Sequence, residues 1–304
     1  MTFSIAARDP ETDAVGVAVQ SKFIAVGSVV PFVSADAGAI ATQSFANVAY
    51  GPDGLSLIRE GRSAGEVLDR LIEGDAEAES RQVGVVGQDG SVAAYTGEEC
   101  FEYAGSRQGE TYTVQGNILE NEATVTAMAE TFEERGEDGL PERLIAALHA
   151  ADEAGGDSRG EQSAALYVAK PDGGYDGRND RWVDVRVDDH GSPIDELERV
   201  FRIYDVTLLE RESPAEPREL AGEDALGVAS ALADLGFHDG SPSETFGDAE
   251  RAALEEFRGL NNFENHSLAV IEDALARGWS DADGEGEARL FDAIWHGLSN
   301  YDRK

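Results

Sequence analysis

Short apolar segments bounded by turn residues begin at the second residue, and this pattern limits the fold more than any other feature of the chain. Residues 2–7 and 15–19 have strand length and are separated by the turn sequence Asp9-Pro10-Glu11-Thr12-Asp13, which predicts a β-hairpin. Further strands are predicted at 26–33, 37–42, 82–86 and 91–96, around Tyr112, and at 163–169 and 182–187.

Helical segments separate two groups of these strands. Ser63 and Glu66 form a capping box ahead of apolar residues with helical spacing. Helices are also predicted at 122–134, 141–152 and 193–209. Strands, helices, strands and a closing helix favour an α+β fold of two stacked sheets with helices outside over a doubly wound parallel sheet.

The end of the chain has a different pattern. Residues 212–219 are charged, contain two prolines and lack apolar periodicity, as is typical of a linker. Beyond them, apolar residues keep helical spacing without a strand pattern. We therefore predict a first domain at residues 1–211 and a small all-α domain at residues 220–304.

The charge balance excludes some classes of partner. The chain carries 61 Asp and Glu against 24 Lys and Arg, a formal net charge of -37. Such a surface repels nucleic acid and anionic membranes. Its self-repulsion needs screening, and the Debye length falls to about 3 Å at molar salt. With no basic-then-apolar leader and no apolar run of membrane-spanning length, we expect a salt-rich cytoplasmic location.

Thr2 stands directly after the initiator methionine. If Met1 is removed, Thr2 carries a hydroxyl and a free α-amine, and a threonine paired with its own terminal amine is one way to activate a weak nucleophile. The alternative is an ordinary strand start, since threonine is a common second residue. The first ten residues leave both interpretations open.

Three polar segments lie where strands are predicted to begin or end. The glycine-rich loop at 155–166 leads into a strand, and its Asp157 and Arg159 are placed to face a cleft. Residues 43–47 and 115–117 follow strands. The alternative for each is a purely structural turn, and two adjacent glycines suit a helix C-terminus.

Taken together, these segments resemble an uncharacterised family placed in the N-terminal-nucleophile hydrolase superfamily, domain of unknown function 1028, whose members are sometimes labelled fimbrial assembly proteins. The resemblance covers about residues 1–210 and rests on motifs that occur in order. These are MTFSIAARD at 1–9, VQSKF at 19–23, ATQ at 41–43, AYGP at 49–52, QGN at 115–117, GGDSRGEQSAAL at 155–166 and VDDH at 187–190. The family implies a four-layer αββα sandwich of two antiparallel sheets.

The resemblance implies an N-terminal-nucleophile amidohydrolase that cleaves a small amide or peptide-like bond. Removal of Met1 would expose Thr2, whose hydroxyl attacks the carbonyl while its α-amine accepts the proton. No cofactor is expected, the partner is the small-molecule substrate, and a homo-oligomer is left open. The alternative is a noncatalytic binding or assembly protein that retains the fold.

This interpretation gives roles to the polar segments. Lys22 is expected to lower the pKa of the α-amine and hold the hydroxyl, with a surface lysine as the alternative. Asn47 and Asn117 are expected to donate to the oxyanion. Asp157 and Arg159 would orient the amine or bind a substrate carboxylate. The candidate catalytic residues are therefore Thr2, Lys22, Asn47, Asn117, Asp157 and Arg159.

Other chemistries have weaker support. Residues 184–190 include metal-ligand types, but their alternation with valines indicates a half-buried strand that ends in a turn. A serine triad built on His149 or His190 lacks a Gly-x-Ser-x-Gly elbow. Cys100 is the only cysteine, which excludes an internal disulfide, and neighbouring glutamates disfavour its thiolate.

Two patterns in the tail indicate binding functions. Residues 235–257 resemble a peptidoglycan-binding-like helical module, with a protein-contact or stabilising appendage as the alternative. Acidic residues from Asp281 to Asp292 are spaced as in a calcium loop. Acidic loops are expected anyway in so acidic a chain, so no metal is predicted.

Overall fold

The computed structural model describes residues 2–209, 217–278 and 285–300, and the chain divides into two compact units, Met1–Val200 and Phe201–Lys304. The division falls inside helix α5 (Pro193–Leu208). The predicted linker at 212–219 lies mostly outside the described residues, and so do residues 281–284 of the calcium-loop-like pattern from Asp281 to Asp292.

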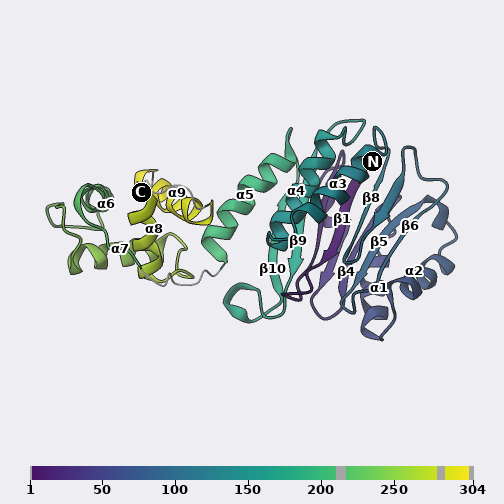
Figure 1. Cartoon of the computed structure of the whole chain (residues 1–304), viewed down its shortest axis with the longest axis horizontal. Coiled ribbons are helices and arrows are strands. Elements are labelled where there is room, and N and C mark those ends of the chain that lie inside the picture. The colour runs from purple at the N-terminus through teal and green to yellow at the C-terminus, as the bar shows by residue number, and fades with distance from the viewer. Residues whose placement is uncertain (1, 210–216, 279–284, 301–304) are drawn as a thin grey trace. The chain divides into compact units, whose positions relative to one another are not determined.

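The first unit is built around two antiparallel sheets (Figure 1). The larger sheet has the order β10-β9-β2-β1-β8-β7, and the smaller has the order β3-β4-β5-β6. The strands are β1 (Thr2–Arg8), β2 (Val15–Ser21), β3 (Pro31–Ser34), β4 (Gly38–Ser44), β5 (Arg81–Gly87), β6 (Val92–Thr96), β7 (Gly105–Gln108), β8 (Tyr112–Asn117), β9 (Ser163–Ala169) and β10 (Arg181–Val187). This confirms the predicted α+β class with two antiparallel sheets.

The sheets pack face to face, with β1 against β4 and β5 against β8. Helices cover their outer faces, as Figure 1 shows: α3 and α4 lie on the larger sheet, and α1 and α2 on the smaller. These helices are α1 (Tyr50–Arg59), α2 (Ala64–Glu73), α3 (Ala123–Glu134) and α4 (Leu140–Glu153). Alternation along β1 sends Phe3 and Ile5 toward the helices and Thr2 and Ser4 toward the other sheet.

Local sequence signals account for several of these elements. The predicted hairpin β1–β2 forms with Thr2 opposite Ser21, and the predicted capping box at Ser63 begins α2. The strand predicted at 26–33 is wrong in its first half, because Val26–Ser28 is a 3-10 helix and β3 starts at Pro31. The side-chain hydroxyl of Ser163 accepts from the Val26 amide and turns the chain there.

The second unit is helical in its described residues, which confirms the predicted helical tail. Its helices after α5 are α6 (Gly222–Asp234), α7 (Asp248–Leu260), α8 (Leu268–Gly278) and α9 (Glu285–Asn300). Their apolar faces form one core, in which the rings of Phe237 and Phe257 meet edge to face at 5.7 Å.

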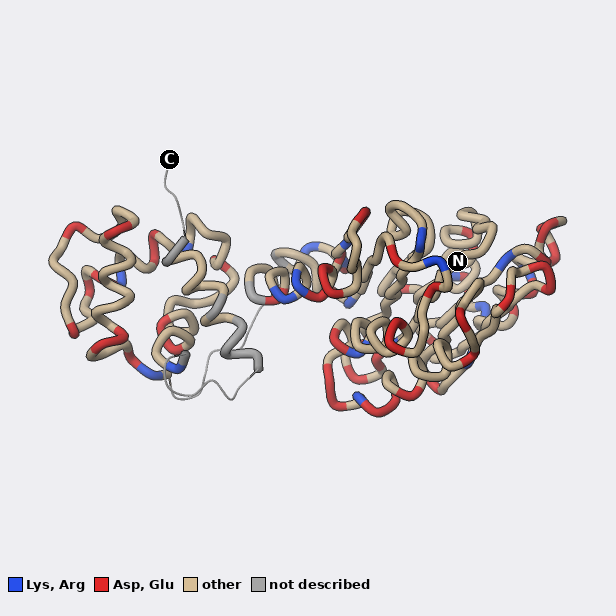
Figure 2. Tube along the Cα trace, turned by 90° about the horizontal axis from the view of Figure 1, so that it is seen from above, with Lys and Arg blue, Asp and Glu red and all other residues tan. Residues whose placement is uncertain are grey.

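Acidic residues are spread along both units, as the red segments of turns and helices show in Figure 2. They outnumber the basic ones by 61 to 24 in the whole chain, which makes mutual repulsion the dominant long-range electrostatic effect. None of the helices in the described part of the chain combines the length and apolar composition that a membrane span needs.

Candidate functional site

A row of polar side chains crosses the larger sheet at one end. Asn117, Thr2, Ser21 and Ser163 are successive cross-strand neighbours on β8, β1, β2 and β9. Directly opposed residues of an antiparallel sheet point to the same face, so all four face the smaller sheet. Each is buried. Four adjacent polar side chains on an inner sheet face are costly to bury, which singles out this end of the sheet.

Thr2 lies in the middle of this row and at the edge of a pocket. Its Oγ1 is 3.0 Å from Ser21 Oγ, and the residue is 7% exposed. The pocket has a volume of about 280 Å³ and is lined by Thr2, Ser21, Lys22, Phe23, Val26, Val29, Val30, Gln43, Ser44, Ala46 and Arg159. A threonine hydroxyl is therefore accessible from a small pocket between the two sheets.

Three of the candidate residues, Lys22, Asp157 and Arg159, meet at one side of this pocket. The carboxylate of Asp157 is fully buried and accepts from the backbone amides of Lys22, at 3.0 Å, and Arg159, at 2.9 Å. The Arg159 guanidinium pairs with the same carboxylate at 3.4 Å. Lys22 is exposed, and its Nζ donates to the backbone oxygen of Glu161 at 2.8 Å. Asp157 thus holds the backbone of Lys22 and the guanidinium of Arg159 beside Thr2. The Thr2 hydroxyl contacts Ser21 and the Lys22 ammonium contacts Glu161, so the contact expected between Lys22 and this hydroxyl is not observed.

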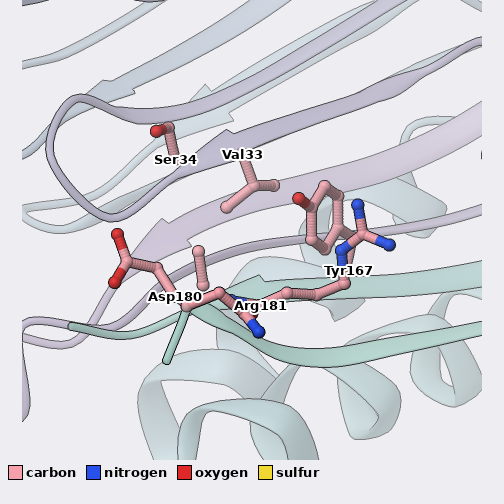
Figure 3. A pocket seen from close by; sticks show the side chains of 7 residues that line it. Val33, Ser34, Tyr167, Asp180 and Arg181 are labelled. Carbon is pink, nitrogen blue, oxygen red and sulfur yellow. The ribbon is translucent and has the colours of Figure 1, made fainter. Parts of the chain in front are cut away.

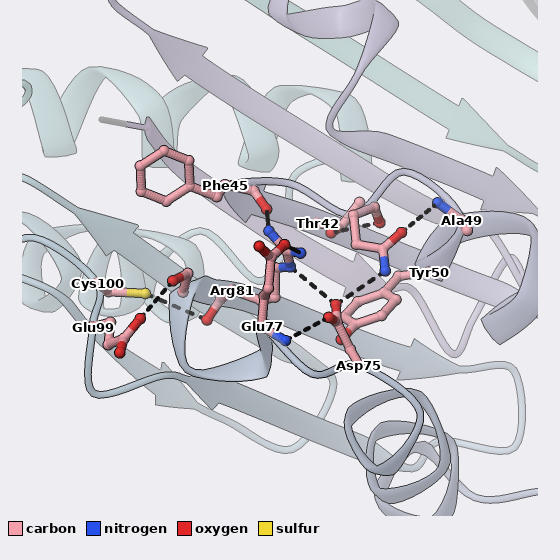
Figure 4. A network of polar contacts seen from close by, with 11 residues as sticks. Thr42, Phe45, Ala49, Tyr50, Asp75, Glu77, Arg81, Glu99 and Cys100 are labelled. Carbon is pink, nitrogen blue, oxygen red and sulfur yellow. Dashed lines mark hydrogen bonds and ion pairs between the residues drawn. The ribbon is translucent and has the colours of Figure 1, made fainter.

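Asn47 lies in a different environment. Its Nδ2 donates to Asp75, which follows α2, at 3.0 Å, and its Oδ1 accepts from the Ala49 amide in its own loop, so both ends of the amide have partners (Figure 4). Asn47 is not among the described residues that line the pocket, so nothing in the structure supports its expected role as an oxyanion donor.

The same network fixes the loop between β4 and α1. Arg81 pairs with Asp75 at 3.0 Å and donates to the backbone oxygen of Phe45, and Tyr50 donates to Asp75 at 2.9 Å (Figure 4). The guanidinium of Arg81 holds the pKa of Asp75 well below its usual range. Because Ala46 lines the pocket, this ion pair determines the position of one pocket wall.

A cluster of buried amides lies behind Thr2 and was not predicted from the sequence. Gln43 donates to Gln82 at 2.8 Å and to the backbone oxygen of Thr2 at 3.3 Å. Asn117 donates to the same Gln82 oxygen at 3.0 Å. Ser4 donates to Gln43, and Gln115 donates to Ser4 at 2.6 Å. The sequence shows that these strands carry polar residues. It does not show which of them meet, because that depends on how the two sheets pack and on the register of their strands.

Backbone strain is concentrated at the strand ends around this pocket. Ala25, Ser44 and Ile118 have φ values of 52°, 70° and 53°, in the left-handed region. The other non-glycine residues with positive φ in the described chain are Asp13, Asp172 and Asn262, residue types that tolerate it. A β-branched isoleucine does not, and such strain tends to be kept at functional sites.

Carboxylates beside the pocket have perturbed titration. Burial raises the pKa of Glu161, and the negative charges of Asp152 and Asp195 raise it further. Burial also raises the pKa of Asp152. Since Glu161 supplies the backbone oxygen that Lys22 contacts, part of this acidic group lies next to the cationic side of the site.

The remaining candidates have structural partners. His190 lies in a turn, where its ring contacts the backbone of Ser192, and His149 pairs with Glu198 at 2.9 Å. Cys100 is buried and its thiol contacts the backbone oxygen of Arg81. Among the described residues, no three His, Cys, Asp or Glu side chains are grouped as a metal site requires.

A second pocket, of about 360 Å³, lies between β3 and the β9–β10 pair (Figure 3). The Arg181 guanidinium lies over the Tyr167 ring, 5.7 Å from its centre. The Asp180 carboxylate lies at the other side of the pocket, where it accepts from the Asp172 amide (Figure 3). Acid and base are balanced there, and its described lining lacks the paired hydroxyls of the Thr2 pocket.

Comparison with known proteins finds a family model that matches each of the two units. The family model described as "Family of unknown function (DUF1028)" matches residues 2–197, and that described as "Putative peptidoglycan binding domain" matches residues 207–291. The crystal structure of protein SPO2555 from Silicibacter pomeroyi, which carries the DUF1028 model, is similar: identity is 32%, coverage is 67% of this chain and 89% of that one, and the TM-score is 0.61. No functionally curated protein matches the chain.

Proposed function

This chain belongs to the DUF1028 family of unknown function, and we propose that it is an N-terminal-nucleophile amidohydrolase that cleaves a small amide. The observation that carries the proposal is the position of Thr2, whose hydroxyl lies 3.0 Å from that of Ser21 at the edge of a pocket with two cationic residues. Two facing antiparallel sheets with helices on both outer faces are the layering expected of such a hydrolase.

The proposed reaction requires removal of Met1. The Thr2 hydroxyl oxygen then bonds to the amide carbon, and its proton passes to the Thr2 α-amine. The C–N bond breaks as the α-ammonium returns this proton to the leaving nitrogen, which gives an ester on Thr2. Water hydrolyses the ester with the amine again as base. An ordinary α-amine pKa is about 7.7–8.0, and a cation such as Lys22 lowers the pKa of that amine.

Asn117 is the proposed oxyanion donor. It is not among the described residues that line the pocket, but it is the cross-strand neighbour of Thr2, and one of its two amide hydrogens is used on Gln82. Loss of one such donor commonly lowers kcat by about 10²-fold or more. Asp157 is a positioning residue, because it acts through Lys22 and Arg159. No residue in this scheme requires a cofactor, and the charge of -37 fits a salt-rich cytoplasm.

The test combines mass and turnover. Intact-mass analysis of the native protein is expected to show loss of Met1 and an unblocked amine, and an electrophilic amide library is expected to label Thr2. Thr2→Val should abolish turnover and labelling, while Thr2→Ser keeps part of both. Thr124→Val makes the same change at a buried threonine of α3 whose hydroxyl has no hydrogen-bond partner among the described residues, outside the pocket and the amide cluster, and should retain turnover. A retained Met1, or a label on another residue, would contradict the mechanism.

A second candidate rests on the helical unit, because a peptidoglycan-binding model matches residues 207–291. In this alternative the chain is a noncatalytic binding or assembly protein. Sedimentation of the full chain with insoluble peptidoglycan tests it. Binding by the full chain with no turnover and no adduct would favour this candidate over the amidohydrolase.

A further inference from the structure

The Thr2 pocket has a charge opposite to that of the chain. Acidic residues outnumber basic ones by 61 to 24 overall, yet the described residues that line this pocket include Lys22 and Arg159 and no carboxylate. Lys22, Arg159 and the buried Asp157 together carry a net charge of +1. Glu161 lies next to Lys22 but outside the lining, and burial disfavours its negative charge by raising its pKa. A local positive charge in so acidic a protein favours entry of an anion and matches a single negative charge.

One further wall of the pocket is apolar. Val26, Val29 and Val30 line it from the segment after β2, together with Phe23, which is 50% exposed. The rings of Phe45 and Phe101 pair at 6.0 Å on the adjoining loops, and both are more than half exposed. Large apolar side chains left exposed in one region of a strongly acidic protein are typical of a ligand contact.

Both walls are fixed by buried polar groups. The segment after β2 is held by Ser163, which accepts from Val26 and donates to the backbone oxygen of Phe23. The loop after β4 is held by Arg81, as described above. A volume of about 280 Å³ equals the space of about nine water molecules, which admits a small molecule and not a folded partner.

We propose that the pocket binds a small amide that carries one carboxylate and, on the other side of the scissile bond, a short branched aliphatic group. The carboxylate contacts Lys22 and Arg159, and the aliphatic group packs on the valines of the opposite wall. This assignment rests on the proposed function, in which the amide carbonyl lies at the Thr2 hydroxyl between these two ends.

The experiment measures binding apart from turnover. Thr2→Val removes the nucleophile, and calorimetry in molar KCl then compares N-isovalerylglycine with N-isobutylmalonamic acid, its isomer with the amide bond reversed. The neutral primary amides of both compounds test the charge, N-acetylglycine tests the aliphatic group, and N-isovaleryl-aminomethylphosphonate tests a dianion. Lys22→Gln and Arg159→Gln are made in the same background. Arg186→Gln is the matched control, since Arg186 lines a different pocket on the same sheet.

At least one carboxylate isomer is expected to bind about tenfold or more tightly than its neutral amide and than the phosphonate. Lys22→Gln and Arg159→Gln should each remove most of this preference without changing binding of the neutral amide, and Arg186→Gln should change neither. N-acetylglycine should bind more weakly by about fourfold for each methylene that leaves the apolar wall. Thermal unfolding of each variant shows whether it is folded, and the exposed Lys22 is the change least able to disturb folding.

Equal binding of acid and neutral amide, tighter binding of the phosphonate, or no binding of either carboxylate isomer would overturn the assignment. These outcomes are independent of the mechanism. If Thr2 is labelled by electrophiles but neutral amides bind best, only the substrate class is wrong. If the carboxylates bind as expected while Met1 is retained and Thr2 is unreactive, the pocket's ligand stands and the hydrolase does not.

Discussion

Gln82 and Asn117 join the two sheets directly behind Thr2: Asn117 Nδ2, on β8, donates to Gln82 Oε1, on β5, at 3.0 Å. Gln82 in turn donates to the backbone oxygen of Gly116 at 2.8 Å and to Thr96 at 3.0 Å. Both side chains are almost fully buried. The cross-strand neighbour of Thr2 is therefore held by the opposite sheet, and its orientation depends on one glutamine.

Gln82→Met is expected to destabilise the protein by about 2–4 kcal/mol. Methionine fills a similar volume but leaves the donors of Asn117 and Gln43 and the Gly116 oxygen without this partner, and buried unpaired polar groups cost about 1–3 kcal/mol each. Urea unfolding at constant KCl measures the change. Gln108→Met, on an exposed strand edge, is the control and should change stability by about 0.5 kcal/mol or less. Equal effects of the two changes would exclude a structural role of the buried cluster.

Ser21→Ala is expected to lower kcat for amide turnover by about tenfold or more with a smaller change in KM. The Ser21 hydroxyl lies 3.0 Å from Thr2 Oγ1 and holds it for attack. Steady-state kinetics measures this, and Ser21→Thr should restore part of the rate because it restores the hydroxyl. A Ser21→Ala protein with unchanged kcat would show that Thr2 needs no such support.

Much of the fold follows from local sequence, and the exceptions have tertiary causes. The strand predicted at 163–169 is found at those residues, because its apolar run and preceding glycine-rich loop are local signals. Helix α1 is not predicted, since Gly51, Pro52 and Gly54 disfavour a helix. In the structure, a Cβ on Gly51 would lie 2.1 Å from the ring of Phe32, so this glycine allows α1 to approach β3 closely. Propensity here is outweighed by packing.

The candidate site also has residues that the sequence predicts and residues that only the structure reveals. Thr2, Lys22, Asp157 and Arg159 are found by residue type and by position at the beginning or end of a strand, and the structure places them around one pocket or in contact with its lining. Gln43 belongs to a quoted motif but has no predicted role, and Gln82 is not singled out. A buried glutamine has no local signature, because its partners Asn117 and Gln43 come from other strands. Gly84 shows why: a Cβ there would lie 2.2 Å from Gln115 Oε1, a contact set only by the facing sheet.

Lowering the salt concentration is expected to destabilise the protein. At about 0.1 M salt the Debye length is about 10 Å, against about 3 Å at 1 M, so repulsion among the excess carboxylates is less screened. Thermal unfolding in KCl from about 0.1 to 3 M should show a rising midpoint, with KCl and NaCl acting alike at equal ionic strength. A midpoint independent of salt would show that repulsion among the carboxylates does not limit stability.

Asp75→Asn is expected to destabilise the protein by about 2–4 kcal/mol near pH 7, because the Asp75 side chain is 9% exposed and its partner Arg81 11%. Arg81 lowers the pKa of Asp75, so the stabilisation is present above the unfolded pKa of about 3.9 and is lost as pH falls through the lower folded value. The difference between wild type and variant should therefore shrink below about pH 4.

Asp36→Asn is the control for this pH effect. Arg59 lowers the pKa of Asp36 to about 2, but both side chains of this pair are about half exposed, so the stability change should be about 1 kcal/mol or less. Unfolding curves of both variants across pH 2–7 make the comparison. Equal losses of unfolding free energy for Asp36→Asn and Asp75→Asn would show that burial of the ion pair between Arg81 and Asp75 does not increase its contribution to stability.

Asp152→Asn is expected to act in the opposite direction and to stabilise the protein by about 0.5–1 kcal/mol at pH 7. Burial, followed by repulsion from Asp195, raises the pKa of Asp152 against the opposing effect of His149. A raised carboxyl pKa means that the folded state disfavours the charge, so wild-type stability falls as pH rises through the unfolded and then the folded pKa. The gain should vanish near pH 4 and below.

Glu134→Gln is the control for this change, because it also removes a negative charge near a helix C-terminus, at the end of α3, but from an exposed side chain. If burial causes the effect at Asp152, Glu134→Gln should stabilise the protein less than Asp152→Asn. A loss of stability at pH 7 would instead show that the Asp152 carboxylate contributes a bond to the loop at Gly155 and Gly156, which leads toward the pocket.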